Sequence, residues 1–372
     1  MESPKYLIVQ EWIKSEIHKG NYVNGDKLPS ENELIERFGF SRQTVRLAIS
    51  NLENMGYLER VKGSGTYVHV HSSHSAKEEK NIGVILRHLD YYIYPEIVKG
   101  IEAVLMQNGY TMTLGITHDR TDMEASVLNS MMEKKLDGII SEPCKTAMPM
   151  PVKDVYARIG AQLPLVFLGG SYQGLDVPVV SMDYIDGAKL AAEYLIKMGH
   201  RNIGCVLKSD DLSGHFKYEG INQALAAHNI KVNDRNVLWF SSDMSDNLFS
   251  TLFRQVYFSG FNRCTALVAQ DDKTAELIVN MLKGMNIKPF EDVSIVSFDN
   301  SATAEMLGLT SVNHSKSELG AKCAETLLRL IRTKSAKSEM MRGRLVMRES
   351  VKKREFANSW DGGDDLSETF EE

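Results

Sequence analysis

From residue 81 onward, short runs of β-branched and aliphatic residues alternate with longer stretches of helical periodicity. The runs at 82–86, 138–141 and 203–207 contain four or five residues, which is the length of a strand buried in a sheet. Helical stretches such as 95–107 and 187–198 lie between such runs. Strands that alternate with helices of this length form parallel sheets covered by helices on both faces. The pattern therefore predicts an α/β fold with two doubly wound parallel-sheet lobes.

The composition is typical of a water-soluble protein of two or three domains. The 372 residues exceed the ~100–200 residues of an ordinary domain. The longest apolar runs are strand-sized, far short of the ~20 residues of a membrane helix, and no signal peptide is visible. The four cysteines are scattered, without a Cys-x-x-Cys pair, which favours buried thiols over a disulfide or zinc site. We expect a cytoplasmic protein without a membrane segment, a metal or a cofactor.

The formal net charge of −6 does not exclude a nucleic-acid partner, because the acidic residues are unevenly distributed. Residues 355–372 contain seven acidic residues and no lysine or arginine, so the remainder carries about +1 (−6 + 7). This acidic tail is expected to be disordered. Phosphate binding depends on local charge, so a DNA-binding surface remains possible. Residues 71–80 are polar and indicate a linker between residues 1–70 and an effector-binding domain at 81–350.

Residues 1–70 have the pattern of three helices followed by a hairpin. Ser30 and Ser41 can cap the second and third helices, and Glu33 completes a capping box with Ser30. In the third helix, apolar residues recur at positions i, i+3, i+4 and i+7 and must face the core. These residues are Val45, Ala48, Ile49 and Leu52.

The same periodicity turns the polar start of the third helix outward. Arg42, Gln43 and Arg46 face solvent, with Thr44 at the edge of the same turn. Arginine can pair with guanine and glutamine with adenine in the major groove, and a helix N-terminus favours phosphate. A solvated charged face is the alternative, because residues 1–70 hold nine basic and nine acidic side chains. The basic turn that follows at 62–65 has two glycines, which let backbone amides approach DNA, and this favours DNA binding.

Three motifs in this region carry a family resemblance: LPSENEL at 28–34, FGFSRQTVR at 38–46 and GSGTYV at 63–68. Together they resemble the winged helix-turn-helix signature of the GntR family. The resemblance implies a DNA-binding domain at residues 1–70 in which Arg42, Thr44, Arg46 and the wing glycine contact the operator. Asn32 departs from the pattern, since many members have arginine there. The candidate DNA-binding residues are Ser30, Asn32, Ser41, Arg42, Gln43, Thr44, Arg46, Lys62, Gly63 and Gly65.

In the C-terminal part, acidic residues follow several strands, where open α/β sheets bind their ligands. Carboxylates that accept hydroxyl protons, a cation and aromatic rings are suited to a polyol. Helix N-capping is the alternative role for Asp183 and Asp272. The candidate effector-binding residues are Tyr92, Tyr94, Glu142, Asp183, Lys217, Asp271, Asp272 and Asp299.

An enzyme is the alternative class of protein. Paired carboxylates could hydrolyse a glycoside, and a GntR-type domain can be fused to an aminotransferase-like domain. The sequence contains no Gly-x-Ser-x-Gly, Walker A, Gly-x-Gly-x-x-Gly after a strand or His-Glu-x-x-His motif, and the chain is short for an aminotransferase fusion. We therefore expect no catalytic residues.

The C-terminal part also contains a series of short motifs: IGVI at 82–85, DGII at 137–140, DG at 186–187, YEGI at 218–221, DD at 271–272, VSFD at 296–299 and LTSV at 309–312. In this order they resemble the effector domain of the LacI/GalR family, which is related to periplasmic sugar-binding proteins. The resemblance implies a repressor that forms a homodimer on double-stranded operator DNA and is released when a sugar binds. Two positions depart from the family pattern, Lys217 in place of arginine and Asp271 in place of asparagine.

The combination of a GntR-type and a LacI-type domain is similar to a group of sugar-responsive repressors of Gram-positive bacteria. That resemblance implies L-arabinose as the small-molecule effector. Because of Lys217 and Asp271, another pentose, a hexose or a sugar phosphate stays open. A sugar-binding protein whose N-terminal domain contacts protein instead of DNA is the remaining alternative.

Overall fold

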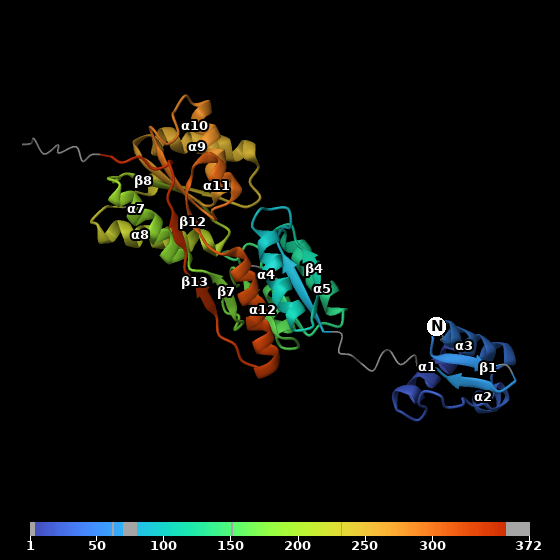
Figure 1. The fold of residues 1–372 in the computed structure, drawn as a ribbon. Helices are drawn as coiled ribbons and strands as arrows, with labels where there is room; N and C mark the ends of the chain where they lie inside the picture. Colours follow the sequence, from blue (N-terminus) through green and yellow to red (C-terminus); the bar gives the residue numbers. More distant parts are fainter. Residues whose placement is uncertain (1–3, 62, 70–79, 150–151, 232, 355–372) are drawn as a thin grey trace, which may run out of the picture. The chain divides into compact units, whose positions relative to one another are not determined.

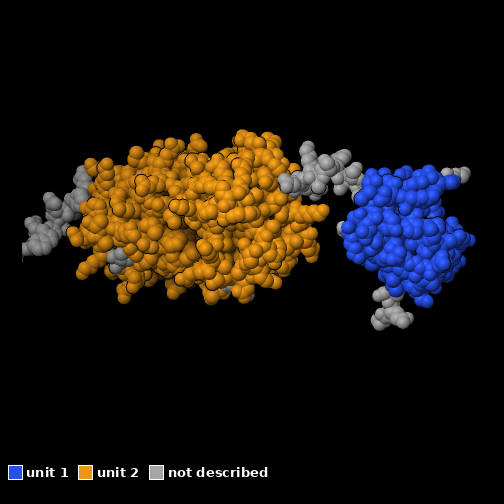
Figure 2. Space-filling view, turned by 90° about the horizontal axis from the view of Figure 1, so that it is seen from below, with its two compact units in different colours: residues 1–79 blue, residues 80–372 orange. Residues whose placement is uncertain are grey.

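The computed structural model describes residues 4–61, 63–69, 80–149, 152–231 and 233–354. Lys62, most of the expected linker (71–79) and the acidic tail (355–372) lie outside the described residues. The chain divides into two compact units, residues 1–79 and 80–372, which are considered separately (Figures 1 and 2). None of the helices in the described part of the chain combines the length and the apolar character needed to cross a bilayer.

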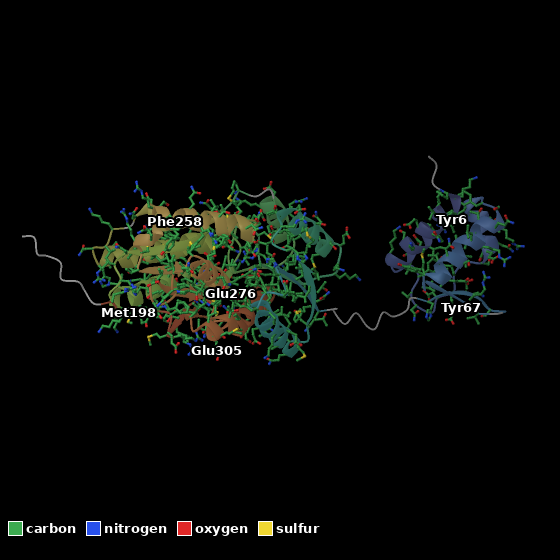
Figure 3. The ribbon with its side chains drawn as sticks, turned by 90° about the horizontal axis from the view of Figure 1, so that it is seen from above. Tyr6, Tyr67, Met198, Phe258, Glu276 and Glu305 are labelled. Atoms are coloured by element: carbon green, nitrogen blue, oxygen red, sulfur yellow. The ribbon has the colours of Figure 1, made fainter. Side chains whose placement is uncertain are left out.

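The smaller unit is a three-helix module with a two-stranded sheet. Its core contains the four apolar residues expected from α3, each at most 1% exposed, together with Val9, Ile13 and Leu34. Tyr6 and Tyr67 lie in this unit, on its first helix and its second strand (Figure 3). The two strands pair antiparallel. The elements are α1 (Lys5–His18), α2 (Glu31–Phe38), α3 (Arg42–Asn54), β1 (Leu58–Val61) and β2 (Gly65–Val68).

The larger unit contains two lobes, each built on a six-stranded sheet. The first sheet has the strand order β13-β7-β6-β5-β3-β4 and is parallel throughout. Its strands are β3 (Asn81–Leu86), β4 (Thr111–Ile116), β5 (Gly138–Ser141), β6 (Leu165–Leu168), β7 (Val179–Met182) and β13 (Glu339–Met341). The helices of this lobe are α4 (Tyr94–Gln107), α5 (Thr121–Met132), α6 (Val152–Gly160) and α12 (Lys316–Thr333).

Helices cover both faces of the first sheet, because successive side chains of a strand point to opposite faces. Ile82, Val84 and Leu86 of β3 pack with α4 and α12, whereas Ile85 packs with α5 and α6. In Figure 1, α12 lies beside α4 although more than 200 residues separate them in the sequence. This is the doubly wound arrangement that the sequence predicts.

The second lobe repeats the arrangement with the strand order β14-β12-β11-β10-β8-β9, in which only β14 is antiparallel. Its strands are β8 (Ile203–Lys208), β9 (Val237–Phe240), β10 (Ala266–Ala269), β11 (Ser294–Phe298), β12 (Thr310–Asn313) and β14 (Arg344–Val346). Its helices are α7 (Tyr184–Lys197), α8 (Leu212–Ala227), α9 (Asp246–Ser259), α10 (Asp272–Gly284) and α11 (Ala302–Leu307), with short 3₁₀ helices at Asp234–Asn236 and Phe261–Arg263.

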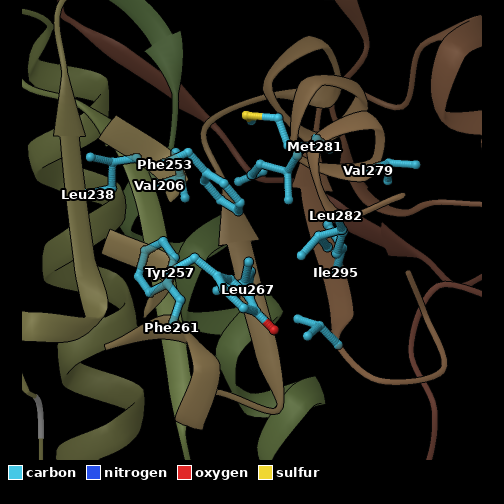
Figure 4. Packing of buried hydrophobic residues seen from close by; sticks show 14 of the residues in the cluster. Val206, Leu238, Phe253, Tyr257, Phe261, Leu267, Val279, Met281, Leu282 and Ile295 are labelled. Atoms are coloured by element: carbon cyan, nitrogen blue, oxygen red, sulfur yellow. The ribbon is translucent and has the colours of Figure 1, made fainter. Parts of the chain in front are cut away.

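The aromatic core of the second lobe lies on one face of this sheet. Phe253 and Tyr257 of α9, with Phe261, pack over Leu267 of β10 and close to Ile295 of β11 (Figure 4). The Phe253 and Phe261 side chains are fully buried. Such packing fixes the position of β10 and β11, whose carboxyl ends carry Asp271 and Asp299.

The chain passes between the two lobes three times, from β7 to α7, from β12 to α12 and from β13 to β14. The alternation pattern of the sequence does not predict α6 and α12. The helical pattern of the sequence at 218–228 predicts a helix there, and the structure starts this helix, α8, six residues earlier. The helix begins at Leu212, because the Asp211 side chain accepts a hydrogen bond from Ser213 N–H and caps it. Lys217 therefore lies in the second turn of α8 and not at its start.

Candidate functional site

Helix α3 presents a polar N-terminal turn to solvent. Ser41 caps the helix by accepting a hydrogen bond from Thr44 N–H at 3.3 Å, and its hydroxyl lies 2.8 Å from the Thr44 hydroxyl. Arg42, Gln43 and Arg46 are exposed, whereas Val45 is fully buried on the opposite side. The helix thus offers guanidinium and amide donors beside unpaired N–H groups of its first turn, as an element that reads the major groove must.

Two residues of α2 hold these arginines. Arg42 Nη2 donates to Asn32 Oδ1 at 2.9 Å. Glu31 Oε1 lies 3.5 Å from Arg46 Nε and 3.0 Å from Arg60 Nη2. Glu31 and Arg60 were not among the residues expected from the sequence. Their contact joins residues 29 positions apart, a separation that no local pattern reveals.

The hairpin after α3 forms a wing whose turn depends on glycine. Gly63 and Gly65 have φ values of 83° and 134°, which favour glycine. A Cβ on Gly65 would lie 2.7 Å from Cε of Lys27, so the end of this flexible side chain would have to move aside. Ser30 forms the expected capping box with Glu33, whose pKa is lowered by the hydrogen bonds from Ser30. Lys62, the basic residue expected in this turn, lies outside the described residues.

A polar cleft of about 390 Å³ lies between the two lobes of the larger unit. Its lining includes loops that follow the carboxyl ends of β3, β8, β10 and β11, where ligands of open α/β sheets bind. The volume suits a small molecule. Four of the expected effector residues line it: Tyr94, Lys217, Asp271 and Asp299.

Lys217 is a buried cation facing two carboxylates. Its side chain is 3% exposed and its Nζ donates to the carbonyl of Gln270 at 2.5 Å. The same Nζ lies 4.3 Å from the ring centroid of Phe298. Burial lowers the pKa of Lys217, while Asp299 and Asp271 oppose that shift. Because an ammonium has three donors, Lys217 can also donate to a ligand hydroxyl.

Asp271 and Asp299 bring carboxylate acceptors to the cleft. Asp271 caps α10 through Oδ1, which accepts from Thr274 N–H and the Thr274 hydroxyl; within the described structure, Oδ2 stays available as an acceptor. Asp299 has a left-handed backbone (φ 96°) and accepts from the Tyr92 hydroxyl at 2.8 Å. Burial raises the pKa of Asp299, and Lys217 opposes this rise. Tyr92 therefore supports Asp299 from the other lobe and does not itself line the cleft.

Arg87 is the main cleft residue that the sequence reasoning missed. It follows β3, and its guanidinium donates to Glu142 Oε1 at 2.8 Å and to Asp211 Oδ2 at 2.6 Å, with Asp119 3.8 Å away. Although burial opposes its charge, the nearby carboxylates raise the pKa of Arg87. Arg87 belongs to the first lobe and Asp211 to the second, so this contact joins them.

Besides Tyr92, three further expected effector residues, Glu142, Asp183 and Asp272, do not line the cleft. Glu142 is 5% exposed, and its carboxylate is occupied by the Arg87 side chain and backbone N–H and by the Tyr94 hydroxyl. Asp183 caps α7 by accepting from Asp186 N–H. Asp272 is fully buried and accepts hydrogen bonds from three neutral donors: the Ser297 hydroxyl, the Ser311 hydroxyl and Ser301 N–H. For Asp183 the capping alternative holds, and Asp272 ties β11 to β12.

The charges of the cleft favour a neutral or weakly charged ligand. Seven aspartates line it, against one arginine and three lysines. A second hollow of about 490 Å³ lies near the start of β6 and has two charged lining residues, Asp176 and Lys334. The interlobe cleft is therefore the better candidate for binding a ligand rich in hydroxyl groups. The acidic lining residues are Asp90, Asp119, Asp211, Asp243, Asp246, Asp271 and Asp299, and the basic ones are Arg87, Lys208, Lys217 and Lys273.

Two family models match the chain. Residues 5–68 match the bacterial regulatory proteins of the gntR family. Residues 79–350 match the periplasmic binding proteins and sugar binding domain of the LacI family. The two matches cover the unit that carries α3 and the unit that carries the cleft.

Two curated proteins are similar to this chain along most of its length. The arabinose metabolism transcriptional repressor of Geobacillus stearothermophilus is 32% identical over 94% of this chain and 98% of its own length. The protein of that name from Halalkalibacterium halodurans is 29% identical over 88% of this chain and 89% of its own. Among solved structures, transcription regulator CcpA of Lactococcus lactis has a TM-score of 0.66 at 22% sequence identity. The match covers 73% of this chain and 99% of the CcpA chain, and at this identity it shows the fold alone.

Proposed function

The chain belongs to the family of bacterial transcriptional repressors that join a gntR-type DNA-binding domain to a LacI-type sugar-binding domain. We propose that its effector is L-arabinose. It regulates transcription and is not an enzyme, and it acts in the cytoplasm as a homodimer. The sugar binds the interlobe cleft and lowers the affinity of the winged helix for its operator. The observation that carries the proposal of a sugar-responsive repressor is the presence, in one chain, of an exposed arginine-bearing helix and an interlobe cleft lined by carboxylates, cations and aromatic rings. L-Arabinose itself is supported by the two relatives named as arabinose metabolism transcriptional repressors.

The DNA contacts in this proposal are centred on the first turn of α3. Arg42, Gln43 and Arg46 reach base edges, while the Ser41 and Thr44 hydroxyls and the helix N-terminus contact phosphate. Asn32 acts by orienting Arg42, to which it is hydrogen-bonded. The remaining proposed contacts come from the N-terminus of α2 and from the wing: Ser30, Lys62, Gly63 and Gly65.

The effector contacts are Arg87, Lys217, Asp271 and Asp299, with aromatic rings of the β3–α4 loop against the sugar's C–H surface. Two half-buried carboxylates and two cations can satisfy a polyol whose hydroxyls both donate and accept. The excess of carboxylates over cations opposes a phosphate group by like-charge repulsion. These charges support a neutral sugar over a sugar phosphate.

Coupling follows from differential affinity for two arrangements of the lobes. A sugar that contacts both lobes favours one interlobe angle, and three chain crossings allow such a change without unfolding either lobe. A coupling free energy of roughly 1–3 kcal/mol is typical of such systems and corresponds to about 5–150-fold in operator affinity.

Two measurements test this function. A fluorescent duplex of about 30 base pairs, selected by the protein from random DNA, is titrated by anisotropy with and without L-arabinose. We expect weaker binding with the sugar; unchanged affinity, with sugar binding proven by calorimetry, would refute the coupling. A thermal-shift panel with L-arabinose, D-xylose, D-ribose, D-galactose and arabinose 5-phosphate tests the effector, because stabilisation grows with ligand concentration over Kd. A larger shift with the phosphate than with L-arabinose would refute the neutral-sugar assignment.

A further inference from the structure

A buried carboxylate that does not line the cleft lies behind it in the first lobe. Glu124 on α5 is fully buried, and its hydrogen-bond partners among the described residues are all neutral donors. Oε1 accepts from the Tyr156 hydroxyl at 2.7 Å and from Cys144 N–H at 3.1 Å, and Oε2 lies 2.8 Å from the Tyr172 hydroxyl. A buried carboxylate without a cation is costly in its ionised form. Burial accordingly raises the pKa of Glu124, which its hydrogen bonds only partly oppose.

If Glu124 is ionised, two oxygens near Tyr172 compete for a single hydroxyl proton. The Tyr172 oxygen lies within hydrogen-bonding distance of both Glu124 Oε2 and the Cys144 carbonyl, the latter at 2.5 Å. A phenol has one proton, so it can donate fully to only one of these oxygens. If Tyr172 donates to the carbonyl, protonated Glu124 can donate to Tyr172. Every oxygen then has a proton partner.

These bonds hold the backbone of Cys144 through both its N–H and its carbonyl. Cys144 lies in residues 142–147, which follow β5 and which we term the bridging loop. At its start the loop presents Glu142 to Arg87, one of the cations that line the cleft. Beyond Cys144 it contacts the second lobe three times: Lys145 pairs with Asp243, the Thr146 hydroxyl accepts from Leu212 N–H at 3.0 Å, and Ala147 N–H donates to the Asp210 carbonyl at 3.1 Å.

We propose that Glu124 is a positioning residue of the effector site, which acts as a neutral carboxylic acid to hold the bridging loop through Tyr172 and Cys144. The fixed loop keeps Glu142 against Arg87 and holds Lys145, Thr146 and Ala147 in contact with the second lobe. Glu124 touches no ligand. Its contribution reaches the sugar only through the position of the loop.

The test compares Glu124→Gln with Glu124→Met by isothermal titration calorimetry of the full chain with L-arabinose. Glutamine reproduces the donor and acceptor pattern of a neutral acid, so its Kd should stay within about twofold of the parent protein. Methionine has similar length but no hydrogen bonds, so Kd should rise on the order of tenfold. A loss of folded protein lowers the stoichiometry, whereas a displaced loop raises Kd at unchanged stoichiometry. Tyr172→Phe, which removes one hydroxyl from the same path, should raise Kd in the same direction if the methionine variant does not fold.

A parent-like Kd for both Glu124→Met and Tyr172→Phe would overturn the positioning role of Glu124. A Kd for Glu124→Gln as high as that for Glu124→Met would overturn the claim that Glu124 acts as a neutral acid. The proposal rests on the proposed function for its ligand, so hydrogen exchange is measured without sugar. The amides of the bridging loop should exchange faster in Glu124→Met than in Glu124→Gln, while the β10 and β11 strands stay protected. Equal exchange rates of these amides in both variants refute the proposal, even if L-arabinose proves to be the wrong effector. If the parent protein does not bind L-arabinose, only the effector assignment is refuted.

Discussion

The Arg87–Asp211 contact between the lobes offers a quantitative test of how the cleft is held. Asp211→Asn preserves the side-chain size and the oxygen that caps α8 through Ser213 N–H, but removes the charge opposite Arg87. An exposed ion pair would contribute ~0–1 kcal/mol. Here the side chains are only 19% and 11% exposed and the atoms are 2.6 Å apart, so the value for a charged hydrogen bond, ~1.5–3 kcal/mol, applies. We therefore expect the substitution to lower the free energy of unfolding of the larger unit by about 2 kcal/mol.

The pH dependence of this loss has a definite sign. Although burial opposes ionisation, Arg87 and Lys208 lower the pKa of Asp211 in the folded protein. Its stabilising contribution is therefore fully present above the unfolded pKa of ~3.9 and is lost as pH falls through the lower, folded value. The difference between parent and variant should stay constant from pH 5 to pH 8 and shrink only below about pH 4.

Urea unfolding followed by circular dichroism measures both quantities. A double-mutant cycle with Arg87→Gln isolates the pair from the contacts that Arg87 makes with Glu142. A coupling energy below about 0.5 kcal/mol would show that solvent screens this pair in spite of its burial, and would refute the reasoning. A difference that grows as pH falls would contradict the sign derived for Asp211.

Three further changes test other parts of the molecule. Arg46→Ala should weaken operator binding, measured by anisotropy, by ~1–3 kcal/mol and leave the sugar affinity, measured by calorimetry, unchanged. An equal loss of both affinities would contradict the assignment of Arg46 to DNA contact. Gly65→Ala places a side chain at a φ of 134°, which favours glycine, while the flexible Lys27 side chain can move away from the new Cβ. The free energy of unfolding of the smaller unit should therefore fall by ~1–3 kcal/mol, and an unchanged thermal midpoint would argue against the wing geometry. Phe253→Ala should cost ~3–5 kcal/mol in urea unfolding, whereas Phe258→Ala, 68% exposed, should cost less than about 0.5 kcal/mol; equal losses would contradict the packing of α9.

Features that arise from local periodicity and capping can be predicted from the sequence of this chain. The 3.6-residue period of α3 places Val45 in the core and Arg46 in solvent, whatever else the chain does. Ser30 and Ser41 mark helix starts because a cap bonds to an amide two or three residues away. The alternation of strands and helices likewise predicts two parallel-sheet lobes, because a parallel connection needs a helix between strands.

Which polar side chains contact one another depends on the packing of the folded chain. An acidic residue after a strand can face the cleft, cap a helix or bind the neighbouring strands. The local sequence around it is similar in all three cases. Asp272 is buried because Ser297 and Ser311, 25 and 39 residues away, lie beside it in the folded sheet. Arg87 meets Asp211 across 124 residues, and Glu124 meets Tyr172 across 48. Such contacts depend on lobe packing and strand order, which act over distances that no local pattern encodes.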